Sequence, residues 1–516
     1  MTGNGTTRAD AWVLAGTILP SAMAFIDQSA VNITLPAIQA DLHASGAQLL
    51  WTINGYTLML ASLIIVGGTL GDRIGRRLTY LIGICIFTVA SAACAFSPSA
   101  VFLISARIAQ GLGGALMIPG SLSIISAHFP REKRGAAIGT WSAVTTITTA
   151  GGPVLGGFFA GAGLWRLVFL INLPLGVVAF LMLVLKVPES RSSEAGRGID
   201  IPGAATIAVA LAGLSYALIA APDQRFASPL VYGALITGVL SFAGFVVIER
   251  RSASPMVPLS IFRSLPFSGA NLLTLFLYGS LTAFSFFLPL TMVQAQGYRE
   301  SVAGMTMLPF VVMLAGMSRL AGKISDRIGP RVLLTVGPVL VGAGYLLSTF
   351  SGLTRGASAY WSTYFPAIVV FGAGMGMTVT PLTTTVMNSA GEQRSGTASG
   401  VNNAVSRIAG VLAIAVLGPL ALVQFSHLVQ HGVANFDISP TQADSLKAEL
   451  SNLGNARVPT GITGDTASRI DRVLRISLVE TFRIIMYVCT GLAWLSALLA
   501  NIFLGRTANP VRGKPL

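Results

Sequence analysis

Long apolar runs recur along this chain, and each of them is long enough to cross a lipid bilayer. They lie near residues 12–36, 48–70, 79–97, 100–126, 136–161, 166–187, 202–221, 229–249, 267–293, 302–321, 332–351, 361–387, 398–423 and 477–504. A membrane-spanning helix needs about 20 mostly apolar residues, so each run predicts one span. Charged residues make up 10% of the 516 residues, too few to cover the surface of a soluble protein. The sequence therefore predicts an all-α, multi-pass membrane protein with fourteen transmembrane helices.

The excess of basic residues indicates orientation in the membrane. The formal net charge is +14, which in a soluble chain would suggest a nucleic-acid partner. With the N-terminus inside the cell, the Lys and Arg clusters near 73–77, 131–134 and 323–331 all fall on the inner side. Short basic loops stay in the cytoplasm. We therefore expect cytoplasmic N- and C-termini, a long extracytoplasmic loop at about 424–476, and no nucleic-acid partner.

The cysteines and histidines do not indicate a metal or disulfide site. Cys85, Cys94 and Cys489 all lie inside apolar runs, so no disulfide framework is expected. His427 and His431 lie one helical turn apart in the long outer loop, and the absence of a third ligand beside them favours a solvated pair over a metal site. We expect no metal and no cofactor.

Two inner loops repeat one another. The stretch GGTLGDRIGRR at 67–77 follows the second span, and AGKISDRIGPR at 321–331 follows the tenth. An interval of eight spans fits two six-helix halves separated by an inserted hairpin at 202–249. The predicted division is an N-terminal bundle at 1–190, the hairpin with its flanking loops at 191–262, and a C-terminal bundle at 263–516.

The ordered series of motifs resembles the fourteen-span drug:proton antiporters of the major facilitator superfamily over nearly the whole chain. The motifs are FIDQSAVNITLP, WTINGYTLMLASLIIVGGTLGDRIGRR, LISARIAQGLGGA, AGGPVLGG, WRLVFLINLPLG and RIAGVLAIAVLG. The resemblance implies the major facilitator fold, a multi-pass protein of the cell membrane, and multidrug efflux powered by the proton gradient. It also implies that the chain is not an enzyme, and we expect it to act as a monomer.

The repeated loop has two interpretations. Its arginines could serve only to hold the loop inside the cell, or the loop could be a conformational switch whose charged groups exchange partners as the two halves rock. Glycines in the loop would permit a tight turn and a close helix approach. The resemblance implies that Asp72 meets the thirteenth span and holds the outward-open state. The candidate switch residues are Gly71, Asp72, Arg73, Gly75, Arg76 and Arg77 in the first copy, and Asp326 and Arg327 in the second.

The stretch AGGPVLGG in the fifth run also has two interpretations. Gly152, Gly156 and Gly157 could simply let two helices pack closely. Pro153 removes a helix hydrogen bond and could create a bend where helices of opposite halves pivot. The resemblance implies that this motif accompanies export, which favours efflux over uptake.

Asp27 is the only carboxylate deep inside a predicted span, and Arg107 lies inside the fourth run. A lone charge in a membrane is costly unless it finds a partner or a water-filled cavity. Burial disfavours the charged form of a carboxylate, whereas a nearby cation favours it. Asp27 beside Arg107 is therefore the predicted proton-coupling site, and a structural knot of Asp27 with Ser29 and Asn32 is the alternative.

The substrate cavity is predicted from polar, aromatic and methionine residues inside the spans. Such residues suit adaptable recognition of apolar molecules, although in a helix bundle they also face lipid or core. The candidates are Asn32, Asn54, Tyr56, Gln110, Asn271, Phe284, Phe287, Met375, Met377, Asn402, Asn403 and Arg407.

These features predict alternating access, in which an amphipathic small molecule leaves the cell as a proton enters and the two compete for Asp27. An exporter of an endogenous lipid or metabolite would show the same motifs. A proton-coupled importer would lack the glycine-proline motif of the fifth run. A membrane enzyme would need clustered catalytic groups inside the membrane, and a channel or receptor would not explain the repeated halves.

Overall fold

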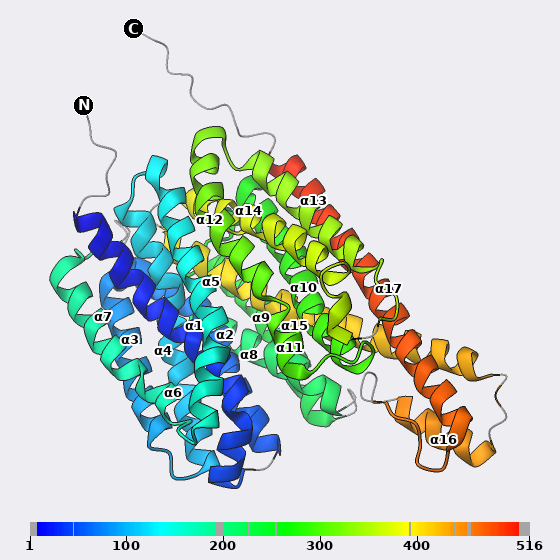
Figure 1. The fold of residues 1–516 in the computed structure, drawn as a ribbon. Helices are drawn as coiled ribbons and strands as arrows, with labels where there is room; N and C mark the ends of the chain where they lie inside the picture. The colour runs from blue at the N-terminus through cyan, green and yellow to red at the C-terminus, as the bar shows by residue number, and fades with distance from the viewer. Residues whose placement is uncertain are drawn as a thin grey trace.

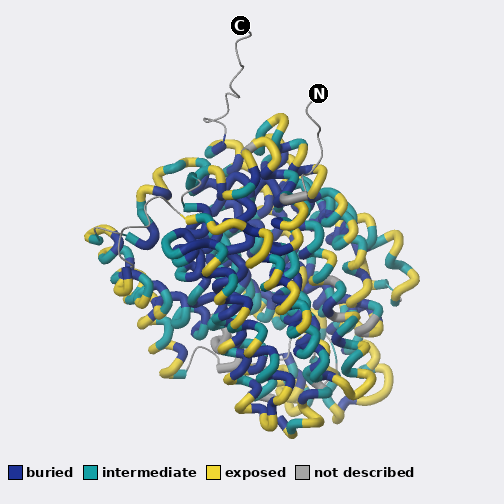
Figure 2. Tube along the Cα trace, turned by 90° about the vertical axis from the view of Figure 1, so that its left-hand side faces the viewer, coloured by how far each residue is buried: buried dark blue, intermediate teal, exposed yellow. Residues whose placement is uncertain are grey.

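The computed structural model describes residues 8–44, 46–191, 200–224, 228–252, 255–354, 356–391, 394–434, 436, 439–450 and 456–504, and the regular elements in these ranges are all helices. The two termini for which a cytoplasmic location is predicted, 1–7 and 505–516, lie outside them. Many large apolar side chains are exposed on the outside of the protein. The buried residues concentrate within the bundle (Figure 2). A helix satisfies its own backbone hydrogen bonds, which is what a bilayer requires of a spanning segment.

The N-terminal part of the chain forms one helical bundle (Figure 1). In it α1 packs on α5 and α7, α4 packs on α2 and α3, and α7 packs on α3. Its helices are α1 (Arg8–Leu42), α2 (Gly46–Ile74), α3 (Arg76–Ala95), α4 (Ala100–His128), α5 (Arg131–Gly161), α6 (Leu167–Leu170) and α7 (Asn172–Lys186).

The C-terminal part forms a second bundle beside the first (Figure 1). Here α14 packs on α12 and α13, while α10 packs on α15 and α17. Its helices are η1 (Leu259–Arg263), α10 (Leu265–Gln294), α11 (Glu300–Met305), α12 (Leu308–Ile328), α13 (Arg331–Ser348), η2 (Gly356–Ala359), α14 (Tyr364–Ala390), α15 (Ser395–Val433), α16 (Pro440–Glu449) and α17 (Gly464–Leu504).

The predicted hairpin is present as α8 (Ile201–Gln224) and α9 (Pro229–Arg251). The two helices pack on one another, and α8 contacts α2 of the first bundle and α15 of the second. Tyr216 of α8 stacks on Trp51 of α2, with ring centroids 5.9 Å apart. The hairpin therefore lies against both bundles.

The fourteen apolar runs are largely helical, although the run 166–187 is divided between α6 and α7 and the run 302–321 between α11 and α12. Length and composition do not settle the number of spans. Twelve helices within the described ranges are long and apolar enough to cross a membrane. The two remaining predicted spans lie in α1 and in α8, whose described apolar stretch is Ile201–Ala217. Fourteen spans stay a prediction.

The region 424–476, for which a polar loop was predicted, is largely helical. It comprises the end of α15, all of α16 and the start of α17, and Figure 1 shows it projecting from the bundle. The Ser439 hydroxyl and the Gln442 side chain form a capping box that starts α16. This outer subdomain has an apolar core of its own, which includes Phe425, Val429, Leu446, Leu450, Ile470 and Leu474. In the sequence these apolar residues are scattered among polar ones, so the pattern did not indicate a core.

Candidate functional site

Asp72 joins the two bundles by capping a helix of the opposite half. Its carboxylate accepts hydrogen bonds from the backbone N–H groups of Gly396, at 3.1 Å, and Thr397, at 2.9 Å. These are the second and third residues of α15, whose N–H groups have no acceptor within their own helix. The negative charge also suits the positive end of the helix dipole. The implied contact of Asp72 with the thirteenth apolar run is therefore present.

Asp326 makes the corresponding contact from the second copy of the repeat. Its two carboxylate oxygens accept from the N–H groups of Gly135 and Ala136, both at 3.2 Å. These are the fifth and sixth residues of α5, so by position their N–H groups already have acceptors inside the helix. The second contact crosses between the bundles as the first does, but it satisfies no otherwise unpaired donor.

The arginines of the first loop bind Asp72 in the loop itself and two backbone carbonyls outside it. Arg76, 4% exposed, forms an ion pair with Asp72 at 3.0 Å inside the same half. Arg73 donates to the Pro255 carbonyl at 2.7 Å, and Arg77 donates to the Val187 carbonyl at 2.9 Å. In the second copy, Arg327 is exposed.

The glycines that allow the bundles to touch are mostly not the predicted ones. A Cβ atom on Gly68 would lie 2.1 Å from the Gly396 carbonyl oxygen, and one on Gly322 would lie 2.3 Å from the Gly135 carbonyl oxygen. Gly71, in contrast, has ordinary space around it, because its nearest neighbours would be 3.9 Å away. It therefore does not support the predicted close approach.

Gly75 does fit its predicted place in a tight turn. Its φ of 133° is unfavourable for any residue with a side chain. A Cβ atom there would also lie 2.8 Å from the Glu189 side chain.

The glycines of the fifth run pack inside one half. A Cβ atom on Gly152 would lie 1.8 Å from the Ser29 hydroxyl, and one on Gly156 would lie 2.5 Å from the Ala30 carbonyl oxygen, both on α1. At Gly157 the nearest atom would be 3.7 Å away, an ordinary contact. The side chain of Pro153 lies outside the described part of the chain. Gly152 and Gly156 therefore fit the close-packing interpretation, since α1 belongs to the same bundle as α5, and the pivot at Pro153 stays a prediction.

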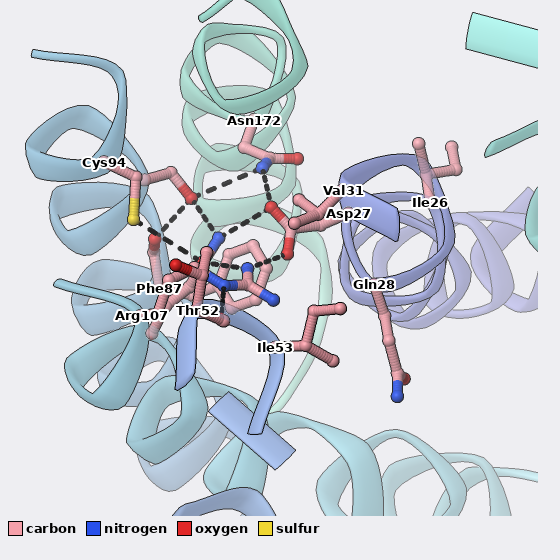
Figure 3. A network of polar contacts seen from close by, with 12 residues as sticks. Ile26, Asp27, Gln28, Val31, Thr52, Ile53, Phe87, Cys94, Arg107 and Asn172 are labelled. Carbon is pink, nitrogen blue, oxygen red and sulfur yellow. Dashed lines mark hydrogen bonds and ion pairs between the residues drawn. The ribbon is translucent and has the colours of Figure 1, made fainter. Parts of the chain in front are cut away.

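Asp27 and Arg107 form a buried ion pair inside the N-terminal bundle, with 0% and 1% of their side chains exposed (Figure 3). The other Asp27 oxygen accepts from the amides of Gln110, at 2.9 Å, and Asn172, at 3.2 Å. Arg107 also donates to the Thr52 carbonyl at 3.1 Å. The carboxylate is thus held by one cation and two amides, contributed by α4 and α7.

Sequence reasoning missed part of this network. Asn172 begins α7, and both Asn172 and Gln110 donate to the Ser91 hydroxyl of α3. A signal existed, because Asn172 and Ser91 are polar residues within apolar runs. Gln110 was assigned to the substrate cavity, but it is 0% exposed and belongs to the Asp27 network.

A central cavity of about 290 Å³ lies between the bundles. Most of its wall combines aromatic and apolar residues with hydroxyl and amide groups. The lining residues are Phe25, Leu122, Trp141, Ser142, Thr145, Thr146, Thr149, Tyr278, Leu281, Phe310, Leu314, Met375, Val379, Thr383, Met387, Ser399, Asn402, Asn403, Ser406 and Arg407.

Four of the predicted cavity residues line this space: Met375, Asn402, Asn403 and Arg407. The others do not, because the helical faces on which they lie point elsewhere. Asn32 is exposed, Asn54 and Met377 are half-buried away from the lining, and Phe284 and Phe287 are buried in the C-terminal bundle, where Phe284 packs on Tyr345 and Phe371. Asn271 is buried behind Asn402, whose amide donates to it at 3.2 Å.

Tyr56 does not line the cavity but lies between it and the Asp27 site. The Arg107 guanidinium sits over the Tyr56 ring, 4.4 Å from its centroid. Tyr56 also interacts electrostatically with Arg407, on the cavity wall. Tyr56 therefore contacts the Arg107 side of the Asp27 site and lies within electrostatic range of Arg407 on the cavity wall.

The hydrogen bonds between the two bundles in the described ranges all lie at one end of the molecule. They link Asp72 to Gly396 and Thr397, Asp326 to Gly135 and Ala136, Thr69 to Thr397, Ser123 to Ser395, and Arg134 to Asn388. This end carries both DRIG loops and is the predicted cytoplasmic end. We refer to these contacts as the inner clamp.

Comparisons with known proteins agree with this arrangement. The Major Facilitator Superfamily profile matches residues 18–414. The chain is 31% identical over 500 residues to the tetracenomycin C resistance and export protein of Streptomyces glaucescens, covering 96% of this chain and 91% of that protein. It is 34% identical to the multidrug resistance protein Stp of Mycobacterium tuberculosis, covering 88% and 84%. Among solved structures, the proton:xylose symporter XylE aligns over 95% of this chain and 94% of its own, with a TM-score of 0.56 and 13% identity, which reflects the fold alone.

Proposed function

This chain belongs to the major facilitator superfamily and is a multi-pass membrane transporter rather than an enzyme; from that premise we propose that it exports amphipathic small molecules, including drugs or antibiotics, in exchange for protons. Relatives that cover most of the chain are export and multidrug resistance proteins. The observation that carries the proposal is the buried Asp27–Arg107 pair, which Tyr56 connects to a cavity between the bundles.

Asp27 is the proposed proton site. Protonation would remove the charge that holds Arg107 and would weaken the hydrogen bonds that Gln110 and Asn172 donate. The helices α1, α4 and α7 meet at this carboxylate, and α1 also carries Phe25 on the cavity wall. A change of protonation is thereby converted into a change in helix packing beside the cavity.

This arrangement replaces the predicted direct competition for Asp27. The carboxylate is 0% exposed and does not line the cavity, so a substrate in this state cannot contact it. Proton and substrate therefore act on one another through Arg107, Tyr56 and α1.

The inner clamp is the proposed switch. It closes the end of the molecule that carries the DRIG loops, which supports an outward-facing state in which the cavity is closed toward the cytoplasm. Opening the inner end requires Asp72 to leave the N-terminus of α15 and Asp326 to leave the backbone of α5. Alternating access then consists of rocking the two bundles about the central cavity.

The wider organisation is proposed on the same basis. We place fourteen spans in the cell membrane, with cytoplasmic termini, bundles at 1–190 and 263–516, and the hairpin region at 191–262 between them. The transporter acts as a monomer, since one chain supplies both halves of the cavity.

An efflux assay in inverted membrane vesicles tests the proposal. A panel of amphipathic drugs should accumulate inside the vesicles when the interior is acidified, and accumulation should stop when an ionophore collapses the pH gradient. Vesicles with Asp72→Asn serve as a control for a carrier that inserts but does not switch. Accumulation that is independent of the gradient would contradict proton coupling, and driven movement in the opposite direction would indicate an importer.

A further inference from the structure

Among the described residues, the wall of the central cavity carries a single charge. Arg407 is the only charged residue among its lining residues, which include no aspartate or glutamate. Arg407 lies on α15, in the interior of an apolar helix, where an uncompensated guanidinium is costly. The charge at this position therefore needs an explanation.

Within the described ranges, Arg407 forms no ion pair or hydrogen bond with another residue. Its electrostatic neighbour is the Tyr56 hydroxyl, which is neutral and does not cancel a positive charge. Arg107 differs in this respect, because it is a buried arginine that Asp27 neutralises directly. Arg107 thus has an internal counter-charge, whereas Arg407 faces the cavity without one in the described part of the chain.

We propose that Arg407 binds the acidic group of the transported molecule, so that the preferred substrates are amphipathic aromatic compounds with one negative charge. The inference rests on the proposed export function and assigns the chemistry of its substrate. A guanidinium binds a carboxylate or a similar planar anion through two parallel hydrogen bonds, which gives orientation as well as affinity.

The rest of the wall fits such a molecule. Phe25, Trp141, Tyr278 and Phe310 provide aromatic surfaces for a ring system, and the hydroxyl groups of Thr145 and its neighbours on α5 provide polar contacts. The cavity volume of about 290 Å³ suits a small ring system with one substituent. A cationic drug would instead meet a positive charge with no carboxylate to offset it.

The test uses three ligands with the same ring and different charge: 2-naphthoate, 2-naphthamide and 2-naphthylmethylammonium. Binding to the purified full-length protein in nanodiscs is measured by equilibrium dialysis at neutral pH. We expect 2-naphthoate to bind at least about tenfold more tightly than the amide, because hydrogen bonds to charged groups are stronger than neutral ones. The ammonium compound should bind more weakly than either.

Three variants assign the preference to Arg407. Arg407→Gln should weaken 2-naphthoate binding by about 10- to 100-fold while changing amide binding less than about threefold. Arg407→Lys should retain part of the preference, since it keeps the charge but loses the fork of donors. Arg319→Gln removes an exposed arginine of α12 that does not line the cavity, and it should bind all three ligands as the wild type does.

Equal affinity of the wild type for the acid and the amide, or no binding of the acid, would overturn the inference. If Arg407→Gln also loses the amide, the comparison between wild type and Arg407→Lys decides instead, because both keep a cation in the cavity. The two proposals can fail separately. Arg407-dependent binding without gradient-driven transport would refute the export function and leave the anion site. Gradient-driven transport of the amide alone would refute the anion site and leave the export function.

Discussion

Replacing Asp72 by asparagine should open the inner end of the transporter. The ion pair of Asp72 with Arg76 lies within one half, so it is present in both conformations and its loss cancels from the equilibrium between them. The bonds to Gly396 and Thr397 cross between the halves and exist only when the inner end is closed. A longer bond from the Thr397 hydroxyl, at 3.3 Å, also crosses. The two shorter backbone bonds therefore set most of the shift in the equilibrium.

The size of the effect follows from the change in charge. A hydrogen bond to a charged acceptor contributes about 1.5–3 kcal/mol, against about 0.5–1.5 kcal/mol for a neutral one, so each of the two bonds weakens by about 1–1.5 kcal/mol. The sum of about 2–3 kcal/mol corresponds to a shift of about 30- to 150-fold toward the state that is open at the inner end.

Asp326→Asn is the matched control. Asp326 binds two N–H groups that have acceptors in their own helix, at 3.2 Å, and its side chain is half-buried. Its replacement should move the same equilibrium by less than about fivefold, or about 1 kcal/mol. The sequence predicts poorer pairing for the second copy, because Pro330 replaces an arginine there, and the structure likewise predicts unequal effects.

The assay is the labelling rate of one cysteine at the clamp. Ser395 is 1% exposed, and its hydroxyl lies 2.9 Å from that of Ser123 across the interface. With the three native cysteines replaced, Ser395→Cys is treated with an impermeant maleimide in inverted vesicles. Asp72→Asn should accelerate labelling by at least about sixfold more than Asp326→Asn does. Equal rates in the two variants, or a rate unchanged by Asp72→Asn, would refute the capping argument.

Three further outcomes are expected. Asp27→Asn should abolish pH-driven accumulation and lower the free energy of unfolding by about 3–5 kcal/mol, because it leaves Arg107 as an unpaired buried charge. In the double variant with Arg107→Gln, thermal unfolding should show partial recovery of stability while transport stays absent. Full transport in either variant would show that Asp27 is structural. Gly68→Ala should slow transport severely, because its Cβ atom would lie 2.1 Å from the Gly396 carbonyl oxygen. The control Gly151→Ala, whose Cβ atom would have nothing within 4 Å, should transport normally. Similar rates in both variants would show that the close contact at Gly68 is not needed for transport. A reporter inserted in the outer subdomain should behave as extracytoplasmic and one fused at the C-terminus as cytoplasmic, and the reverse would contradict the fourteen-span topology.

The sequence was sufficient to predict the pairing of charges in the membrane. Asp27 and Arg107 are isolated charges in separate apolar runs, and the cost of leaving either one unpaired made an interaction between them a strong expectation. The repeated loop likewise identified Asp72 and Asp326 as equivalent positions. The proline in the second copy indicated poorer pairing there, but which N–H groups of the facing helix each carboxylate reaches was not predictable from the sequence.

The cavity was predicted less well, for a geometric reason. Composition identifies a polar or aromatic residue in a span, but not which of the cavity, the lipid or the bundle core its helical face meets. Met375 and Arg407 face the cavity, whereas Phe284 is buried among aromatic residues of the C-terminal bundle. Thr145 and Trp141 on the cavity wall lie outside the AGGPVLGG stretch and carried no signal of their own in the sequence.

Because α15 is long, a small rotation about the inner clamp moves its far end by a large distance. This helix runs 39 residues from the inner clamp to Val433 in the outer subdomain, and at 1.5 Å per residue each degree of rotation about the clamp displaces its far end by about 1 Å. A rotation that is too small to resolve at the cavity therefore produces a larger, measurable displacement at the outer end of α15. A pair of spin labels, one on α16 and one on the N-terminal bundle, would record the conformational cycle without touching the substrate, the proton site or the clamp.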